Sequence, residues 1–147
     1  MINSKISRST CDNNCYQKQY RFLSSGHNNK RSDGKQPGAI SSNHFHSLAN
    51  ETLEKLSDTF DEILELQPGA DVSLSDGVLT VIVKSDAIYV INKQSPNQQL
   101  WFSSPLSGPK RFDMCGNQWI DRDTKQTMKA LLSRELSTLL NKPVSFP

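Results

Sequence analysis

The sequence has few cysteines and no long apolar run, and each shortage excludes a class of protein. Three cysteines among 147 residues cannot all pair with one another, and their spacing matches no zinc signature. We therefore interpret them as unbridged thiols. No apolar run approaches the roughly 20 residues that a membrane-spanning helix needs, so we expect no membrane segment.

Residue patterns of the common catalytic sites are also missing. The three histidines, His27, His44 and His46, precede the predicted packed helix, so none is placed beside a candidate nucleophile. The sequence contains no Glu-x-x-His pair of the kind that builds a di-iron centre in a helix bundle. It also has no glycine-rich phosphate loop. We therefore predict no conventional catalytic site.

Positive charge is concentrated at the start of the chain. Residues 1–40 carry a net charge of +5 and residues 41–147 a net charge of −3. The first segment is basic, contains several serines and is poor in acids, which is typical of a mitochondrial transit peptide. We predict a transit peptide and linker over residues 1–40, with cleavage after Leu23. A tail that stays attached is the alternative, and the scattered charges argue against a nucleic-acid-binding arm.

Residues 41–147 show the periodicity of a folded α+β domain. Apolar residues recur at helical spacing from Phe45 to Leu64, and Pro68-Gly69 ends the run. A second amphipathic helix is predicted over residues 128–140, with Asp123 or Thr124 as its N-cap. Between the helices, turn signals separate six short β-type segments, at residues 72–75, 78–84, 88–93, 99–103, 111–114 and 119–121.

This order of elements predicts a two-layer αβ sandwich, with two helices on one face of an about six-stranded, mostly antiparallel sheet. Neighbouring strands lie ~4.8 Å apart, so six strands make a sheet roughly 29 Å wide. Two helices of ~10 Å diameter, side by side, cover one face only. The other face, which we call the open face, must meet solvent or a partner.

Strand alternation predicts which side chains occupy the open face. If Leu100 and Phe102 are buried under the helices, Trp101 points outward between them. The same argument places Asn92 and Arg111 outward. Tryptophan and arginine often dominate protein interfaces, so we expect a protein partner here. A domain with a net charge of −3 is poorly suited to phosphate, so we expect no nucleic-acid partner.

A stripe of carboxylates is predicted on the first helix, opposite its leucines, and continues into the first strand. Residues three and four apart share one helix face, and like charges there repel, which suggests a cationic partner. Carboxylates alone favour hard ions, so we predict weak, open and exchangeable metal binding. A basic protein surface, or a face that is only solvated, is the alternative. This acidic ridge consists of Glu51, Glu54, Asp58, Asp61, Glu62, Glu65, Asp71 and Asp76.

Three segments of the folded part resemble the frataxin family. Residues 90–113 read VINKQSPNQQLWFSSPLSGPKRFD, residues 48–53 read LANETL and residues 76–80 read DGVLT. The resemblance implies the αβ sandwich, a mitochondrial matrix location and binding of iron (Fe2+ or Fe3+) along the acidic first helix and strand. It also implies docking on the complex of cysteine desulfurase and iron–sulfur scaffold protein, where the family accelerates sulfur transfer to the scaffold.

The resemblance also assigns contact positions for that complex, namely Asn92, Gln94, Trp101 and Arg111. We expect an iron-binding activator of iron–sulfur cluster assembly that acts principally without catalysis. We expect it to be a monomer that can oligomerise with iron. A ferroxidase that oxidises Fe2+ to Fe3+, or an iron storage and buffering protein, is the alternative.

The chain departs from the family pattern at two places that bear on these expectations. The family's acidic ridge is often denser, and Asn50 stands where an acid is common. The tail after Leu140 has only seven residues. In relatives with longer tails this segment covers the cleft between the helices, so we expect lower stability here.

Overall fold

The computed structural model describes residues 40–147, and the predicted cleavage site after Leu23 lies outside them. The described residues form two helices and six strands, as the sequence predicts. In chain order these are α2 (Ser42–Leu64), β1 (Asp71–Ser75), β2 (Val78–Lys84), β3 (Ala87–Gln94), β4 (Gln99–Ser104), β5 (Gly108–Cys115), β6 (Gln118–Asp121) and α3 (Met128–Leu140).

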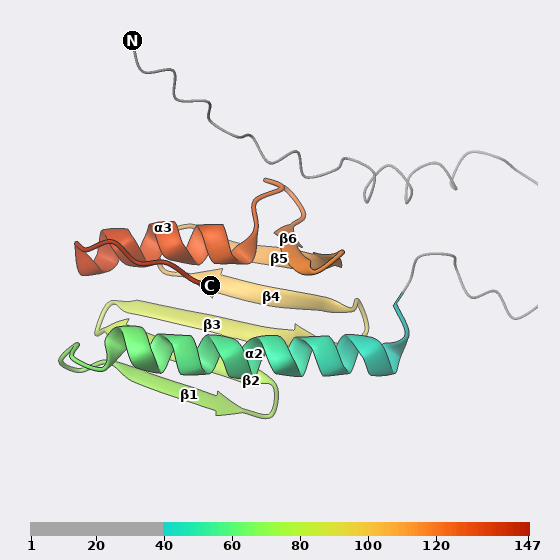
Figure 1. Cartoon of the computed structure of the whole chain (residues 1–147), viewed down its shortest axis with the longest axis horizontal. Coiled ribbons are helices and arrows are strands. Elements are labelled where there is room, and N and C mark those ends of the chain that lie inside the picture. The colour runs from blue at the N-terminus through green and yellow to red at the C-terminus, as the bar shows by residue number, and fades with distance from the viewer. Residues whose placement is uncertain (1–39) are drawn as a thin grey trace, which may run out of the picture. The chain divides into compact units, whose positions relative to one another are not determined.

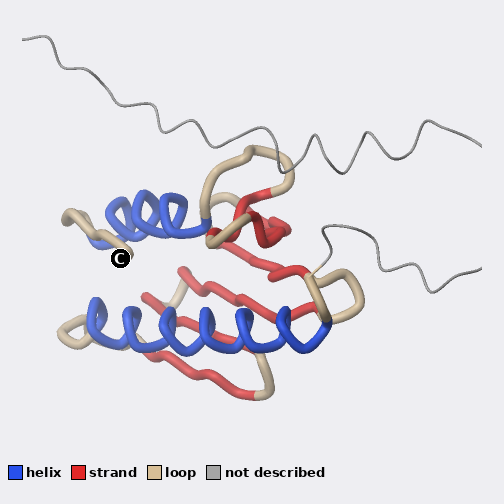
Figure 2. The backbone as a smooth tube through the Cα atoms, turned by 45° about the vertical axis from the view of Figure 1, so that its right-hand side comes forward, coloured by secondary structure: helices blue, strands red, loops and turns tan. Residues whose placement is uncertain are grey.

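All six strands form one sheet whose spatial order follows the chain from β1 to β6. Every neighbouring pair is antiparallel. Both helices lie over the same face, α2 across β1 to β3 and α3 on the side of β6 (Figures 1 and 2). Among the described residues, neither helix is long and apolar enough to cross a membrane. The predicted two-layer sandwich is confirmed, and no described helix covers the other face of the sheet.

Helix α2 begins at a serine cap and buries one row of apolar side chains. The side chain of Ser41 accepts a hydrogen bond from the backbone N–H of His44 at 3.2 Å, which satisfies one of the free donors of the first turn. His44 and His46 lie inside this helix, so the prediction that the histidines precede it is wrong for both. This buried row faces the sheet and consists of Phe45, Ala49, Leu53, Leu56, Phe60 and Leu64.

Helix α3 begins later than the predicted cap residues. Thr127 is the N-cap, and its side chain accepts a hydrogen bond from the backbone N–H of Ala130 at 3.2 Å. Thr124 instead donates its backbone N–H and its hydroxyl to Asp121 in the turn after β6. The prediction of Asp123 or Thr124 as the cap is therefore wrong, because the buried Asp121 holds this turn outside the helix.

The carboxylate of Asp121 is the polar centre of this turn and is 1% exposed. Lys110 of β5 places its Nζ 3.5 Å from Asp121 Oδ2. Burial alone would raise the pKa of Asp121, but the hydrogen bonds from Thr124 and the charge of Lys110 outweigh it and lower that pKa. The ionised carboxylate therefore stabilises the folded state.

We expect Asp121→Asn to lower the free energy of unfolding by about 1–3 kcal/mol at pH 7. Because the folded-state pKa is depressed, this stabilisation is present above the unfolded pKa of ~3.9 and is lost as the pH falls through the folded value. Urea unfolding of both proteins at pH 7 and at pH 3 measures the effect. The difference between them should shrink at pH 3, and an equal difference at both pH values would contradict an ionic role.

A second buried carboxylate ties α3 to the sheet. Glu135 is 3% exposed and accepts hydrogen bonds from the hydroxyl of Tyr89 at 3.1 Å and from that of Ser104 at 2.5 Å. Burial and the charge of Glu135 raise the pKa of Tyr89 above its usual range. Tyr89 therefore stays protonated and donates to Glu135.

The short C-terminal tail reaches back between the helices. Phe146 is 7% exposed and packs edge-to-face on Phe60 of α2, with 5.2 Å between the ring centroids. The hydroxyl of Ser133 accepts a hydrogen bond from the backbone N–H of Phe146 at 3.0 Å. The hydroxyl of Ser137 likewise accepts from the backbone N–H of Val144 at 2.9 Å. The tail thus brings one aromatic side chain into the core.

One interpretation of the cysteines fails. Cys115, at the end of β5, is disulfide-bonded, so the interpretation of the thiols as unbridged is wrong at this position. Cys11 and Cys15 lie outside the described residues.

Candidate interaction surfaces

The open face brings the four predicted contact residues into one patch. Strand register places Asn92 of β3 opposite Trp101 of β4, and Trp101 opposite Arg111 of β5. Gln94 lies two residues beyond Asn92, so it shares the same face. We call Asn92, Gln94, Trp101 and Arg111 the contact patch. Its role in binding stays a prediction.

Trp101 is held at the surface by polar contacts on both sides. Leu100 and Phe102 are buried and the indole between them is partly exposed, as alternation predicts. The guanidinium carbon of Arg111 lies 5.3 Å from the centroid of the ring, which is a cation–π distance. The indole Nε1 donates a hydrogen bond to Gln99 Oε1 at 3.2 Å. The sheet therefore presents an aromatic ring and a cation together.

Two residues that support the contact patch, Gln99 and Asp113, were not predicted as site residues from the sequence. Gln99 is buried, and its Nε2 donates to Asp113 Oδ1 at 2.7 Å while its Oε1 accepts from Trp101. Gln99 and Asp113 are direct partners in the β4–β5 register. Two successive hydrogen bonds thus fix the orientation of the indole. Alternation along β4 puts Gln99 on the same face as Trp101, but only the register reveals its partner.

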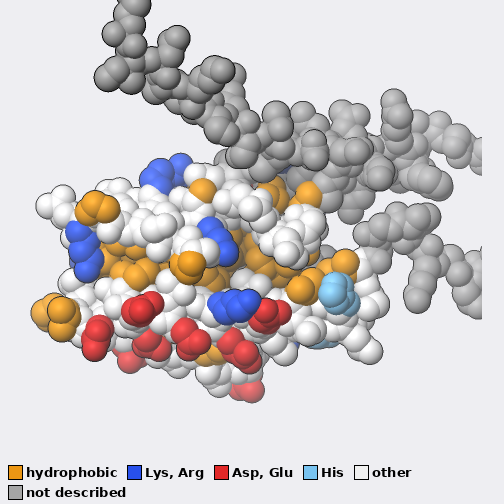
Figure 3. All heavy atoms as spheres, in the orientation of Figure 1, with side chains coloured by type: hydrophobic (Ala, Val, Ile, Leu, Met, Phe, Trp, Pro, Cys, Tyr) orange, Lys and Arg blue, Asp and Glu red, His pale blue; other side chains and the backbone are white. Residues whose placement is uncertain are grey.

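The acidic ridge follows α2 and is open to solvent. All eight carboxylates are exposed, and Figure 3 shows acidic side chains in a row along the helix. Lys55 Nζ lies 2.5 Å from Glu51 Oε1, and this hydrogen bond and charge lower the pKa of Glu51. Among the described residues, no other ridge carboxylate forms an ion pair. Most of the ridge therefore lacks an internal counter-charge.

The ridge is a row of carboxylates and not a preformed metal cluster. Within residues 40–147, no three His, Cys, Asp or Glu side chains lie close enough together to hold one metal ion. Asp71 is the register partner of Ile82 and lies on the open face, on the other side of the sheet from α2. Asp76 lies in the β1–β2 turn with a φ of 51°. An ion on the ridge would therefore meet one or two carboxylates and keep several waters.

Asn50 connects the ridge helix to the sheet. Its Oδ1 accepts a hydrogen bond from Lys93 Nζ at 2.7 Å. The backbone N–H of Lys93 donates to the carbonyl of Gly77 at 2.9 Å. Lys93 thus joins α2, β3 and the β1–β2 turn, and it brings a positive charge to the helix beside Asn50.

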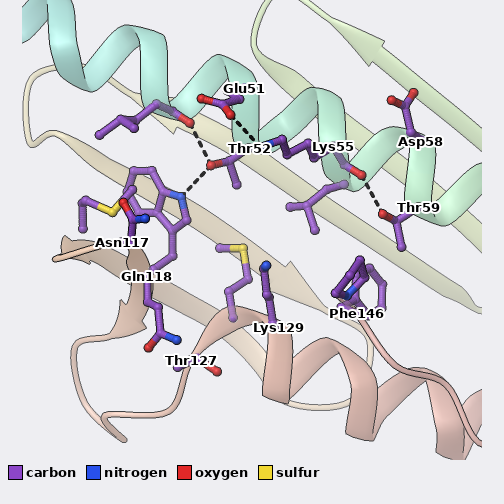
Figure 4. Close-up of a pocket in the computed structure, with 16 residues that line it drawn as sticks. Glu51, Thr52, Lys55, Asp58, Thr59, Asn117, Gln118, Thr127, Lys129 and Phe146 are labelled. Carbon is purple, nitrogen blue, oxygen red and sulfur yellow. Dashed lines mark hydrogen bonds and ion pairs between the residues drawn. The ribbon is translucent and has the colours of Figure 1, made fainter.

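A cleft of about 570 Å³ lies between α2 and α3. Figure 4 shows Thr52 and Lys55 on its α2 side and Lys129 on its α3 side, with Phe146 of the tail at one end. Trp119 also lines the cleft and donates its indole N–H to Thr52 Oγ1 at 2.8 Å. Because the chain's own tail enters this space, we assign the cleft a structural role.

Comparison with known proteins agrees with this geometry. A family model described as a frataxin-like domain matches residues 38–142, which is most of the chain. The chain belongs to the frataxin family. Mitochondrial frataxin of Caenorhabditis elegans is 48% identical over 106 residues, covering 69% of this chain and 78% of the nematode protein. Mitochondrial frataxin of Dictyostelium discoideum is 44% identical over 101 residues, covering 66% of this chain but 52% of that protein.

Solved frataxin structures share the sandwich. Frataxin from Psychromonas ingrahamii has a TM-score of 0.64 at 21% identity, over 74% of this chain and 99% of that chain, which supports the fold alone. A trimeric frataxin from the yeast Saccharomyces cerevisiae, complexed with ferrous iron, has a TM-score of 0.59 at 34% identity, over 75% of this chain and 95% of that chain. The two helices on a six-stranded sheet are therefore the frataxin fold.

Proposed function

We propose that this frataxin-family protein is an iron-binding activator of iron–sulfur cluster assembly. It docks through the contact patch on the complex of cysteine desulfurase and scaffold protein and promotes sulfur transfer to the scaffold. Iron is its cargo, held weakly along the acidic ridge. The observation that carries the proposal is the pairing of Trp101 with Arg111 on a sheet face that no described helix covers.

The form of the contact patch favours a macromolecular partner. Trp101 and Arg111 stand side by side on a sheet, where a protein surface can bury both, and these residue types recur among binding hot spots. The hydrogen bonds from Trp101 to Gln99 and from Gln99 to Asp113 order the indole before binding. Less side-chain entropy is then lost on association.

The open row of carboxylates favours delivery of iron over its retention. Carboxylate oxygens bind hard cations, and an ion that meets one or two of them keeps waters that exchange readily. A bound cation would also relieve the repulsion between like charges on successive turns of α2. The yeast relative complexed with ferrous iron supports iron as the cargo.

The mitochondrial matrix is the proposed location. Relatives from several organisms are named mitochondrial frataxins. The basic composition of residues 1–40 is that of a transit peptide, and cleavage after Leu23 would leave the folded part with its linker.

The direct test is the rate of sulfide production by a reconstituted desulfurase–scaffold complex, with and without this protein. We expect a saturable, several-fold increase in rate. If a folded sample, verified by circular dichroism, gave no increase at any concentration, the activator role would be rejected.

Neutralising four of the eight ridge carboxylates should weaken iron binding and leave the fold intact. We expect the quadruple variant Glu54→Gln, Asp58→Asn, Asp61→Asn, Glu62→Gln to bind Fe2+ at least ~10-fold more weakly in anaerobic calorimetry, because it removes the local negative charge. The control is Asp86→Asn, Asp123→Asn, which neutralises two exposed acids off the ridge, half the number that the quadruple variant changes. Equal affinity of the quadruple variant and the wild type would place the iron elsewhere.

A ferroxidase or iron-storage role is the alternative, and the ridge itself is the observation in its favour. Oxidation of Fe2+ in air, followed by absorbance, separates the two roles when the same quadruple variant is used. A rate that falls with the ridge charges would favour the alternative. An unchanged rate would exclude the ridge as an oxidation site.

A further inference from the structure

The open face carries an apolar stripe next to the contact patch. Val78 of β2 is 37% exposed and Ile88 of β3 is 43% exposed. Ile82 and Val90 are partly exposed on the same face. We call Val78, Ile82, Ile88 and Val90 the apolar stripe. Four branched aliphatic side chains on a face that no described helix covers are unusual, because a sheet face in water normally carries polar residues.

Strand register makes the apolar stripe continuous with the contact patch. Val78 is the direct partner of Asn92, which is in turn the partner of Trp101. Ile82 and Ile88 are direct partners at the other end of the β2–β3 hairpin. The stripe and the patch therefore form one surface across β2, β3, β4 and β5.

Charged side chains lie around the stripe and not within it. On the open face, the uncharged Thr80 lies between Val78 and Ile82 on β2, and the uncharged Asn92 follows Val90 on β3. Asp71 lies beyond the stripe on the edge strand β1, and Lys84 ends β2. Arg111 lies two strands away from β3, on β5. An apolar centre with a polar and charged rim is the usual anatomy of a protein interface.

We infer that the partner's contact extends from the contact patch over the apolar stripe and that the partner segment seated there is apolar and uncharged. This inference rests on the proposed function, because it concerns the same docking event. A basic or acidic segment would gain no counter-charge over the centre of the stripe and would lose hydration there. The stripe thus gives the docking surface an apolar anchor that is separate from the Trp101–Arg111 pair.

Hairpin stabilisation and self-association are two competing roles for the stripe, and each predicts a different result. Cross-strand pairs such as Ile82 with Ile88 stabilise a hairpin by about 0.2–1 kcal/mol. A second copy of this chain could cover the stripe, in which case the protein would self-associate through it. Threonine at Ile82 and Ile88 separates hairpin stabilisation and self-association from docking. It keeps the β-branched side chain that favours a strand and removes apolar surface.

The experiment compares Ile82→Thr, Ile88→Thr in the full chain with the control Leu66→Thr, which removes a leucine that is 91% exposed after α2. Dissociation constants for the desulfurase–scaffold complex are measured by biolayer interferometry, and unfolding midpoints by circular dichroism. We expect the double variant to bind about 10-fold more weakly at an unchanged midpoint, and the control to bind like the wild type. Ile88→Thr alone is the fallback if the double variant is unstable.

The outcomes distinguish the inference from the function on which it rests. If Trp101→Ala weakens binding and the threonine variant does not, the inference is overturned and the proposed docking stands. If neither variant weakens binding, the proposed docking itself is rejected. Sedimentation velocity of the unbound wild type covers the remaining case. A dimer that the threonine variant dissociates would show that a second copy occupies the stripe, and would also overturn the inference.

Discussion

Trp101→Ala should remove most of the stimulation of cysteine desulfurase while leaving the fold intact. The indole is partly exposed, so its loss opens no cavity in the core. In a docked complex the same ring would be buried together with Arg111, and truncation of such an anchor typically costs at least ~2 kcal/mol. We therefore expect the affinity for the desulfurase–scaffold complex to fall by roughly 30-fold or more. Titration of sulfide production against protein concentration measures it.

Two further variants test whether the effect of Trp101→Ala is specific to the contact patch. Trp101→Phe keeps an aromatic face for Arg111 but loses the hydrogen bond to Gln99, so we expect an intermediate affinity. Leu106→Ala removes an exposed apolar side chain from the β4–β5 turn, outside the contact patch, and should behave like the wild type. Full stimulation by a folded Trp101→Ala protein would show that the open face is not the docking surface.

The position of Trp101 was predictable because alternation is a local rule. Once Leu100 and Phe102 are assigned to the core, the residue between them has only the other face available. The same rule, applied from Tyr89 and Ile91, also places Ile88 on the open face. The sequence therefore contains the signal for the apolar stripe, but the predicted contacts include only aromatic, polar and charged residues of that face.

Other features depend on contacts that no local rule predicts. The bond from Gln99 to Asp113 requires the β4–β5 register, which the length of the intervening turn sets. Helical spacing puts Glu135 on the buried face of α3 with Leu131 and Leu132, but only the tertiary structure reveals its partners, the hydroxyls of Tyr89 and Ser104. The predicted cap of α3 is wrong because the preceding turn is held by Asp121. The burial of Asp121 depends on contacts between elements that the local sequence does not show.

A substitution in the C-terminal tail, Phe146→Ala, tests the helix layer separately from the contact patch. Phe146 lies among buried residues that include Phe60 of α2, and backbone hydrogen bonds to Ser133 and Ser137 of α3 hold the tail. Truncating a buried phenylalanine to alanine typically costs about 3–5 kcal/mol, and a chain terminus that relaxes brings the cost toward the lower end. For a domain of about 100 residues, each kcal/mol lowers the unfolding midpoint by about 4–8 °C.

We therefore expect Phe146→Ala to lower the unfolding midpoint by more than about 10 °C, because the cleft between the helices loses a buried aromatic ring. Ser145→Ala, one residue away and exposed, should leave the midpoint unchanged. At temperatures where the variant is still folded, its stimulation of the desulfurase should match the wild type, since the tail packs on the helix layer and the contact patch lies on the opposite face of the sheet. An unchanged midpoint would mean that the tail detaches in solution. A lost stimulation in the folded variant would mean that the partner also contacts the helix layer.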